Sequence, residues 1–323
     1  MNAANPLTTL ACLALLLSSA SAQEWPTRPL RLVVPFPAGG SADVQSRVIA
    51  DELAVVLGQP VIVDNKPGAG GNLGAADAAR SRPDGYTLFL ATTGTHASNI
   101  SLYQKLSFDP VHDFAPLTLV TMSPQLIVSG IKYRDATFGE LVTKLKTAGA
   151  TANYGSSGMG SATHLAGELF NHETGTTLVH VPYRGQGPAL NDLLGGQLDV
   201  MFPLVADVFS FVQSGQLHAF AVMSDKRAKA LPDIPTTAEL GYPRLHMSAV
   251  WTALYTNAGT PQPVIDRLHR ELVRVISSKE FVDKFEALGF EIRTSTPDEL
   301  AAFAAAQMAD WGAIIKALNV RLD

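Results

Sequence analysis

Leu30–Asp43 reads LRLVVPFPAGGSAD, and this stretch decides the fold class. Its first part, Leu30–Phe36, is a nearly continuous apolar run, as expected for a β-strand that is buried on both faces. Two glycines follow, and Val44–Leu57 then repeats apolar residues at helical spacing before Gly58 ends the helix. A buried strand that leads through a glycine-rich turn into a helix is typical of an α/β protein.

The same alternation continues beyond this stretch. Pro60–Val63 and Tyr86–Ala91 are the next expected strands, and Gly71–Arg80 is an alanine-rich helix between them. The order β-α-β-α-β predicts a parallel sheet with helices on both faces.

Two further sets of elements follow. In the middle of the chain we expect strands at Leu126–Val128, Thr151–Tyr154, Leu178–Val181, Leu198–Phe202 and His218–Met223. Helices are expected between them at Thr137–Ala148, Ser161–His172, Pro188–Leu194 and Ala206–Gln213. The last part should contain strands at Ala249–Tyr255 and Phe290–Arg293, and helices at Pro261–Ser277, at Lys279–Leu288 and from Thr296 onward. Two of these helices begin with a capping box, formed by Thr137 with Glu140 and by Thr296 with Glu299.

A chain of 323 residues with 46% apolar side chains is too long to form a single core comfortably, so two domains are expected. The C-terminal helices need a sheet to pack on. We therefore expect the chain to cross into a second lobe near Val120 and to return near Ser224. This assigns residues 23–120 and 224–323 to lobe 1 and residues 121–223 to lobe 2. Two crossings form a hinge that suits closure around a ligand.

Residues 1–22 have the pattern of a signal peptide. The apolar run Leu7–Leu17 has the length of a signal-peptide core, and Ala20-Ser21-Ala22 is a cleavage signal of the A-x-A type. The only cysteine, Cys12, lies in this segment, so the mature protein should have no disulfide and no thiol chemistry. We therefore expect a soluble protein in the periplasm. The net charge of −5 gives no reason to expect nucleic acid or an anionic membrane as a partner.

Glycine-rich turns at the ends of strands are the candidate binding segments. Gly39 and Gly40 allow backbone N–H groups to approach a bound anion, and Ser41 or Asp43 is expected to cap the following helix. Such a turn at the carboxyl end of a parallel sheet is where α/β proteins bind anions. The alternative is a plain tight turn without a ligand.

Two more turns extend this set. Gly68–Gly74 places Leu73 where the dinucleotide-binding fingerprint needs its third glycine, and it lacks the Gly-Lys-Ser/Thr end of a phosphate loop, so nucleotide binding is disfavoured. Tyr154–Ser161 adds hydroxyl groups, which can hydrogen-bond a carboxylate without bringing charge. It contains no G-x-S-x-G motif and therefore no nucleophile elbow.

Several charged side chains have two interpretations. His164 and Glu168 are one helical turn apart and could share a metal, but no third ligand is placed near them and zinc needs at least three. We therefore expect an ordinary helical pair, with no metal and no cofactor. Arg184, which follows Tyr183 at a strand end, is either a bidentate clamp for a carboxylate or a surface arginine. The remaining candidates are expected to be structural, helix-start or surface residues, namely His180, Asp192 and Asp207.

These segments together resemble the Bug-type receptors, the periplasmic substrate-binding components of tripartite tricarboxylate transporters. The resemblance extends from about Trp25 to the C-terminus. The motifs that carry it are, in chain order, Val34–Gly40 with Asp43, Asn65 with Gly68–Gly71, Asp109-Pro110 with Asp113-Phe114, Tyr154-Gly155 to His164-Leu165, His180–Tyr183 with Gly185 and Pro188-Ala189, and Leu231–Thr236 with Glu239 and Gly241.

The resemblance implies a two-lobed α/β fold of the periplasmic-binding-protein type II, in which each lobe is a mostly parallel sheet flanked by helices and the lobes close like a flytrap. It implies a monomeric receptor, not an enzyme, that captures a small carboxylate-bearing molecule and delivers it to integral-membrane transporter subunits. Family ligands include di- and tricarboxylates, acidic amino acids and aromatic acids. The ligand-binding residues expected on this basis are Phe36, Ala38, Gly39, Gly40, Ser41, Asp43, Gly71, Thr95, Ser156, Ser157, Gly158, Ser161, His164, Tyr183, Arg184 and Gly185.

One departure and two alternatives stay open. Pro203 stands where the family often has a polar residue, commonly Asp, so the contacts to the far end of the ligand are not predicted. A hydrolase on the same scaffold is one alternative, with Ser157 as nucleophile and His164 as a base within hydrogen-bond reach of it. The other alternative is a ligand-sensing module for a membrane sensor kinase.

Overall fold

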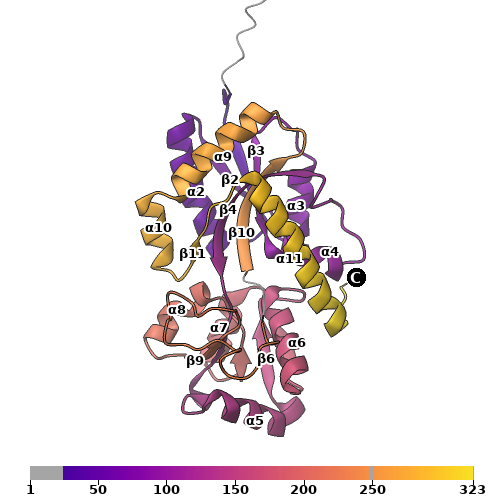
Figure 1. The fold of residues 1–323 in the computed structure, drawn as a ribbon, viewed down its shortest axis with the longest axis vertical. Helices are drawn as coiled ribbons and strands as arrows, with labels where there is room; N and C mark the ends of the chain where they lie inside the picture. Colours follow the sequence, from indigo (N-terminus) through magenta and orange to yellow (C-terminus); the bar gives the residue numbers. More distant parts are fainter. Residues whose placement is uncertain (1–24, 247–249, 323) are drawn as a thin grey trace, which may run out of the picture.

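Two β-sheets lie one above the other along the long axis of the molecule, and each carries its own helices (Figure 1). This computed structural model describes residues 25–246 and 250–322. The predicted signal peptide, with Cys12, lies outside the described residues. The two-lobed α/β architecture that the sequence predicts is confirmed.

The sheet of lobe 1 is parallel on one side and antiparallel on the other. Its strand order is β11-β4-β10-β3-β1-β2. Strand β1 pairs in parallel with β2 and β3, and β10 pairs antiparallel with β3 and β4. The strands are β1 (Leu30–Val34), β2 (Val61–Asn65), β3 (Thr87–Thr92), β4 (Phe114–Ser123), β10 (Val250–Asn257) and β11 (Glu291–Ile292). The parallel part is as predicted, but the sheet is mixed rather than mostly parallel, because β4, β10 and β11 pair antiparallel. The sequence did not predict β4.

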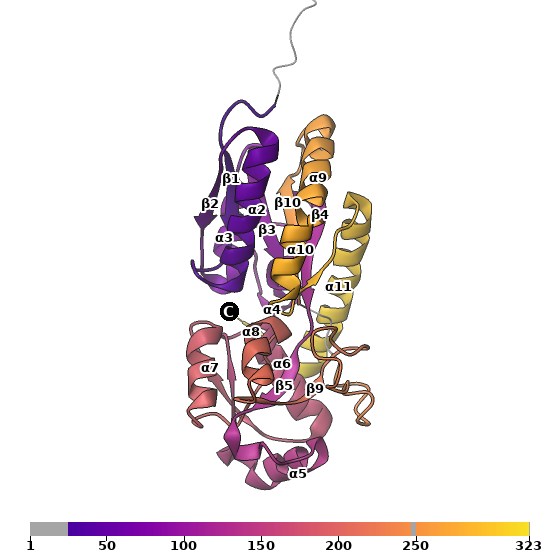
Figure 2. The same ribbon diagram turned by 90° about the vertical axis from the view of Figure 1, so that its left-hand side faces the viewer.

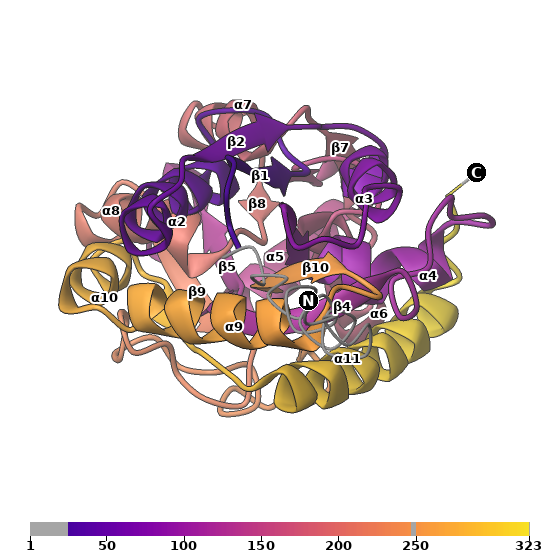
Figure 3. The same cartoon turned by 90° about the horizontal axis from the view of Figure 1, so that it is seen from above.

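Helices cover both faces of this sheet. Helices α2, α9 and α10 lie on one face and α3, α4 and α11 on the other (Figure 3). Their bounds are α2 (Ser41–Leu57), α3 (Asn72–Ala79), α4 (Asn99–Leu102), α9 (Gln262–Ile276), α10 (Lys279–Glu286) and α11 (Pro297–Leu318). Strand β1 is apolar on both faces because Leu32 and Val34 pack into the core under α2 and α9, while Val33 packs into the core on the other side.

The sheet of lobe 2 has the order β7-β6-β8-β5-β9, with β6 parallel to β7 and β8 and with β5 antiparallel to β8 and β9. Its strands are β5 (Leu126–Ser129), β6 (Asn153–Ser156), β7 (Val179–Pro182), β8 (Val200–Met201) and β9 (His218–Val222). Its helices are α5 (Phe138–Ala148), α6 (Ala162–Thr174), α7 (Gln186–Leu194) and α8 (Val205–Gln213). Short 3₁₀ turns occur at η1 (Ala69–Gly71), η3 (Ile131–Tyr133) and η4 (Gly149–Thr151), and a π-helical turn at η2 (Gly94–Ser98).

Local signals in the sequence set several helix ends. The predicted capping boxes are present at the starts of α5 and α11. The side chains of Thr137 and Thr296 each accept a hydrogen bond from the backbone N–H of the paired glutamate, and the glutamate side chain accepts one from the backbone N–H of the threonine. Gly58 ends α2 in the left-handed conformation that favours glycine. Within residues 25–246 and 250–322, we find no helix that combines the length and hydropathy needed to span a membrane.

The chain passes from β4 in lobe 1 directly into β5 in lobe 2, close to the predicted crossing near Val120. The segment after β9 remains on lobe 2 (Figure 2). Thr236 bridges Val222, the Val222 N–H donates to the carbonyl of Pro235 at 2.8 Å, and Leu231 packs into the core of lobe 2. We infer that the return crossing lies after this proline-stiffened stretch rather than near Ser224, because the stretch lies along β9.

Candidate functional site

Three segments of lobe 1 meet where its parallel strands end. They are the turn after β1, the turn before α3 and the π-helical turn η2 after β3. A Cβ atom on Gly71 would lie 2.8 Å from Cγ2 of Thr95 and 3.2 Å from Cβ of Pro35, and the φ of Gly71 is +94°. Only glycine fits this crowded, left-handed position. The structure thus brings together the predicted residues Gly71 and Thr95 and the turn that starts at Pro35.

The turn after β1 leaves the start of α2 open. The residue before the helix is Gly40, in an extended conformation, and no side chain caps the helix. The prediction that Ser41 or Asp43 is the cap is therefore wrong. Ser41 is the first helical residue, and the Asp43 carboxylate reaches back to accept a hydrogen bond from the Gly39 N–H at 2.9 Å. The uncapped N–H groups at the start of a helix of 17 residues favour an anion.

The charge of Asp43 is balanced within the protein. Its buried carboxylate accepts hydrogen bonds from Nε of Arg47 at 2.9 Å and from Nδ2 of Asn65 at 3.0 Å. The hydrogen bond from Arg47 is the main reason why the pKa of Asp43 is lowered. Asn65 also donates to the carbonyl of Phe36 at 3.0 Å, so this network holds the turn in place. Asp43 is therefore a support for the turn, neutralised by Arg47.

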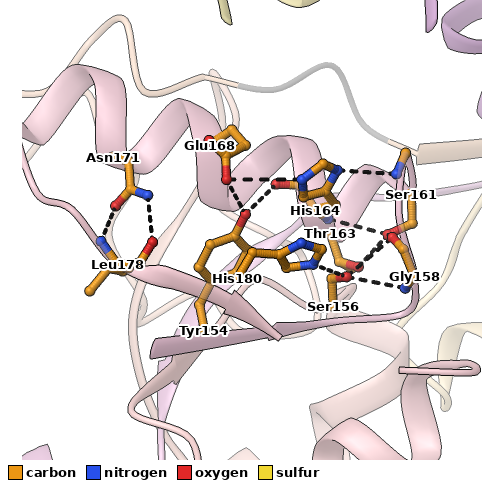
Figure 4. Close-up of polar contacts among 11 residues, drawn as sticks. Tyr154, Ser156, Gly158, Ser161, Thr163, His164, Glu168, Asn171, Leu178 and His180 are labelled. Atoms are coloured by element: carbon orange, nitrogen blue, oxygen red, sulfur yellow. Dashed lines mark hydrogen bonds and ion pairs between the residues drawn. The ribbon is translucent and has the colours of Figure 1, made fainter. Parts of the chain in front are cut away.

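The turn at residues 156–161 of lobe 2 directs several of its amides inward (Figure 4). The N–H groups of Ser157, Gly158 and Gly160 donate to side chains of the same lobe, namely to Oγ1 of Thr163 at 2.9 Å, to Oγ of Ser156 at 3.1 Å and to Nδ1 of His164 at 3.1 Å. These three N–H groups are thus already hydrogen-bonded within lobe 2. The turn instead offers a hydroxyl cluster, made of Ser157, Ser161 and Thr163, in which Oγ1 of Thr163 lies 3.1 and 3.0 Å from the two serine oxygens.

Three stacked rings support this turn from behind. His180 lies between Tyr154 and His164, with ring centroids 4.9 and 4.1 Å away (Figure 4). Nε2 of His180 lies 2.6 Å from Oγ of Ser156, and the Tyr154 hydroxyl donates to Glu168 at 2.5 Å. Burial lowers the pKa of His164, and it lowers the pKa of His180 to about 4, so both rings are neutral at pH 7. His180 is thus structural, as the sequence predicts.

The end of β7 lies against the same turn. A Cβ atom on Gly158 would lie 3.3 Å from the carbonyl oxygen of Tyr183, and the N–H of Gly185 donates to the carbonyl of Ser157 at 3.2 Å. Predicted residues from the ends of β6 and β7 are therefore brought together into one surface of lobe 2.

Two predicted side chains at the end of β7 differ in their contacts. The hydroxyl of Tyr183 donates to Oδ2 of Asp192 at 2.6 Å, and burial together with this carboxylate raises the pKa of Tyr183 to about 12. Asp192 is therefore an internal hydrogen-bond partner rather than a free surface carboxylate. Arg184 is exposed, and we find no ion pair for it within the described residues. Its role as a carboxylate clamp remains a prediction.

Helix α4 adjoins glycine-rich turns from both lobes. A Cβ atom on Gly70 in lobe 1 would lie 3.0 Å from the hydroxyl oxygen of Tyr103, directly after α4. A Cβ atom on Gly160 in lobe 2 would lie 3.5 Å from Cδ1 of Leu102 in α4 and would overlap the side chain of Leu322. The two sets of turns therefore lie at the boundary between the lobes.

The pair needed for the alternative hydrolase is not assembled. Oγ of Ser157 bonds to Thr163, and Nδ1 of His164 is occupied by a backbone N–H. The serine and histidine that do meet are Ser156 and His180, but Ser156 is fully buried and its Oγ also bonds to the backbone of the next turn. A nucleophile has to be accessible to the acyl group that it attacks, and Ser156 is not.

Two polar side chains of lobe 2 are absent from the ligand-binding residues that the sequence predicts. Gln186 begins α7, and its buried Nε2 has no hydrogen-bond partner within the described residues. Asp207 lies in the first turn of α8, directly after β8. Neither had a distinguishing signal in the sequence, because amides and acids are common at the starts of solvent-exposed helices.

Comparison with known proteins agrees with this architecture. A family model described as the tripartite tricarboxylate transporter family receptor (TctC) matches residues 45–320. The protein BugT from Bordetella pertussis is 35% identical over 303 residues, which cover 94% of this chain and 93% of BugT. The resemblance to Bug-type receptors is therefore confirmed.

Solved structures share the whole fold, and periplasmic binding proteins are among them. Rpa4515 from R. palustris, solved with adipate, has a TM-score of 0.86 at 30% identity and covers 92% of this chain and 99% of its own. MatC from Rhodopseudomonas palustris, solved with bound malate, has a TM-score of 0.82 at 30% identity and covers 90% of this chain and 100% of its own. The chain belongs to the receptor family of the tripartite tricarboxylate transporters.

Proposed function

We propose that this protein is a periplasmic receptor that captures a small carboxylate-bearing molecule between its lobes and delivers it to a tripartite tricarboxylate-type membrane transporter. The observation that carries the proposal is the uncapped start of α2, which belongs to the same group of strand-end turns as Gly71 and Thr95. The relatives solved with adipate and with malate support this ligand class, because both molecules are carboxylates.

The ligand carboxylate is held by donors without charge. In lobe 1 it accepts hydrogen bonds from the first N–H groups of α2, where the helix dipole favours a negative charge. In lobe 2 it meets the hydroxyl cluster of Ser157, Ser161 and Thr163. A hydrogen bond to a charged group contributes about 1.5–3 kcal/mol, so a few such bonds give firm but reversible binding. Reversibility is what a delivering receptor requires.

The mature protein acts as a monomer in the periplasm after removal of residues 1–22, and it returns its ligand chemically unchanged. The buried position of Ser156 and the occupied nitrogen of His164 support binding without catalysis. Mass spectrometry of periplasmic protein should show an N-terminus near Gln23. Intact Met1 in a cytoplasmic fraction would contradict export.

The decisive experiment combines native mass spectrometry with calorimetry. Freshly purified mature protein is analysed for a co-purified acid, and the refolded, ligand-free protein is then titrated with that acid. We expect one molecule bound per chain and no product after long incubation. Turnover of carboxylic esters or amides would favour the hydrolase. Loss of ligand-dependent gene expression with intact uptake, in a strain that lacks the protein, would favour the sensory module.

A further inference from the structure

Asp207 is a carboxylate without a charged partner close to the proposed ligand site. The backbone N–H of Leu204 favours the charged form of its side chain, and within the described residues the carboxylate makes no ion pair. A carboxylate has two oxygens and about four acceptor positions, so one N–H leaves most of its capacity unused. The Asp207 side chain is partly exposed, and desolvation by the surrounding protein raises its pKa to about 6.

The start of α8 belongs to the same edge of lobe 2 as the turn at 156–161. Strands β6 and β8 are parallel neighbours, so their carboxyl ends lie side by side. The side-chain amide of Gln125 ties these ends together, because it donates to the carbonyl of Phe202 at 2.9 Å and to the carbonyl of Ala162 at 3.1 Å. Asp207 follows Phe202 by five residues, and Ala162 directly follows the turn at 156–161, so Gln125 links the neighbourhoods of both.

The start of α8 also faces lobe 1. The N–H of Ala206 lies 3.4 Å from Oγ of Ser123 at the end of β4, and a Cβ atom on Gly289 would lie 3.4 Å from the Cα of Ala206. Asp207 is therefore at the boundary between the lobes, one strand along the sheet from the turn that is proposed to hold the ligand carboxylate. A ligand carboxylate at 156–161 would place the remainder of a short ligand within reach of this part of the edge.

We propose that Asp207 determines specificity by accepting a hydrogen bond from the end of the ligand that is remote from its bound carboxylate. The ligand class is then a carboxylic acid with a hydroxyl or ammonium group at that end. A desolvated carboxylate gains most from a donor or a cation and repels a second carboxylate, so the ionised side chain selects against a plain dicarboxylate. This inference rests on the proposed function, whose ligand site it completes.

A series of four-carbon acids tests the inference, because its members differ only at the remote end. The probes are butyrate, 4-hydroxybutyrate, 4-aminobutyrate and succinate, titrated by calorimetry at pH 7.5 into the mature protein. The same comparison is made with hexanoate, 6-hydroxyhexanoate, 6-aminohexanoate and adipate, in case the site fits a longer chain. We expect the hydroxy or amino acid to bind roughly tenfold to a hundredfold more tightly than the diacid of equal length.

Asp207→Asn assigns the preference to this residue. Asparagine keeps the size and one acceptor but removes the charge, so the amino acid should lose at least about tenfold in affinity and the diacid should gain. Asp298→Asn is the matched control, because Asp298 is an exposed acid in the first turn of α11. Asp298→Asn should leave the affinities of all the acids in the series unchanged. If Asp207→Asn does not fold, Asp207→Ser takes its place.

The outcomes separate the two proposals. If the hydroxy and amino acids bind no more tightly than the diacids, the role of Asp207 alone is overturned. The same holds if they bind more tightly but Asp207→Asn leaves this difference in affinity unchanged. That result would restrict Asp207 to bonding the Leu204 N–H at the start of α8. If all eight acids fail to bind, the acid that co-purifies decides: an acid without a hydroxyl or ammonium group at its remote end overturns the role of Asp207 alone, and the absence of any bound acid overturns the proposed carboxylate receptor together with this inference.

Discussion

The N–H of Gly160 donates a hydrogen bond to Nδ1 of His164, with 3.1 Å between the two nitrogens. Only an unprotonated Nδ1 can accept this bond, so the ring carries its proton on Nε2, which lies 3.9 Å from Oε1 of Glu168. The same ring stacks on His180. The conformation of the turn at 156–161 therefore depends on histidines that stay neutral.

Acid should therefore destabilise the protein before its carboxylates are protonated. Burial lowers the pKa of His164, and it lowers the pKa of His180 from 6.5 to about 4. As the pH falls below 6.5, these rings bind protons in the unfolded chain but not in the folded one. The contribution of His180 to the free energy of unfolding is complete above pH 6.5 and is lost down to about pH 4, and that of His164 falls in the same direction. The neutral His180 ring adds a slope of about 1.4 kcal/mol per pH unit in this window, measurable by urea denaturation.

The variant His180→Gln isolates one of these rings. Glutamine can still bond to Oγ of Ser156 but does not titrate, so the free energy of unfolding should depend less steeply on pH by about 1.4 kcal/mol per pH unit. Groups that titrate elsewhere cancel in the difference between variant and parent. An unchanged slope would mean that His180 takes up its proton in the folded protein.

Two glycine-to-alanine changes should have opposite effects on stability. A Cβ atom on Gly167 in α6 would overlap the ring of Tyr154, so Gly167→Ala should lower the free energy of unfolding by about 1–3 kcal/mol. A Cβ atom on Gly139 in α5 would have no atom within 4 Å, so Gly139→Ala should raise the free energy of unfolding by up to about 1 kcal/mol. Urea denaturation of both variants measures this. Equal effects would show that helix propensity, rather than packing on Tyr154, decides the outcome.

Gly40→Asp should abolish ligand binding without unfolding the protein. Asp is a good residue for the position before a helix, and the nearest atom to its Cβ is the carbonyl oxygen of Pro37 at 3.8 Å. Stability should therefore stay equal or rise by a few tenths of a kcal/mol. The added charge would compete with the ligand for the free amides of α2, so the affinity should fall at least about a hundredfold in calorimetry.

Gly40→Asn is the control for this variant, because asparagine has the same size and capping ability but no charge. It should weaken binding at least about tenfold less than Gly40→Asp does. If both variants bind like the parent protein, the ligand carboxylate does not lie at the start of α2.

Arg184→Ala should have a small effect. The side chain is exposed and makes no ion pair with the described residues, so the free energy of unfolding should change by less than about 0.5 kcal/mol. Ligand affinity should fall by less than about tenfold, because the other donors to the carboxylate remain. A loss of a hundredfold, reversed in Arg184→Lys only in part, would instead establish the bidentate clamp.

Ligand should also bring the lobes together. The chain crosses between them from β4 to β5, and we infer a second crossing after Thr236, so two connections suit rotation about a hinge. Small-angle scattering should give a smaller radius of gyration with saturating ligand than without it. The comparison needs protein from which any co-purified acid has been removed, and an unchanged radius in such protein would contradict closure.

The elements that the sequence predicted are those whose signal is local. Successive side chains of β1 point into two different cores, so the strand is apolar on both faces. β4 lacked such a signal because it contains Pro116 and two threonines. One of these, Thr121, is buried because it bonds to the amide of Gln45 at 3.2 Å and to Thr252 at 2.8 Å, partners that are distant in sequence.

The candidate site shows the same limit. Its turns were predictable, because glycines and hydroxyl groups follow strand ends. The direction of their amides was not predictable, because it is chosen by side chains such as Thr163 and His164, which approach only in the folded chain. Asp43 is a residue type that often caps helices. In the structure its carboxylate instead accepts hydrogen bonds from Arg47 and from the backbone of the turn before the helix.

Helix α11 contacts β4, η2 and α4 in lobe 1 and also α6 in lobe 2, and beyond its end the N–H of Leu322 donates to the carbonyl of Leu102 at 2.7 Å. The lobes are thus in contact along this side of the molecule, and we expect them to part on the other side, where α2 lies above α7 and α8 (Figure 2). The proposed solute would then enter and leave on that side. A membrane subunit of the proposed transporter would have to face that side and touch both lobes at once, and it could thereby sense directly whether the receptor is loaded.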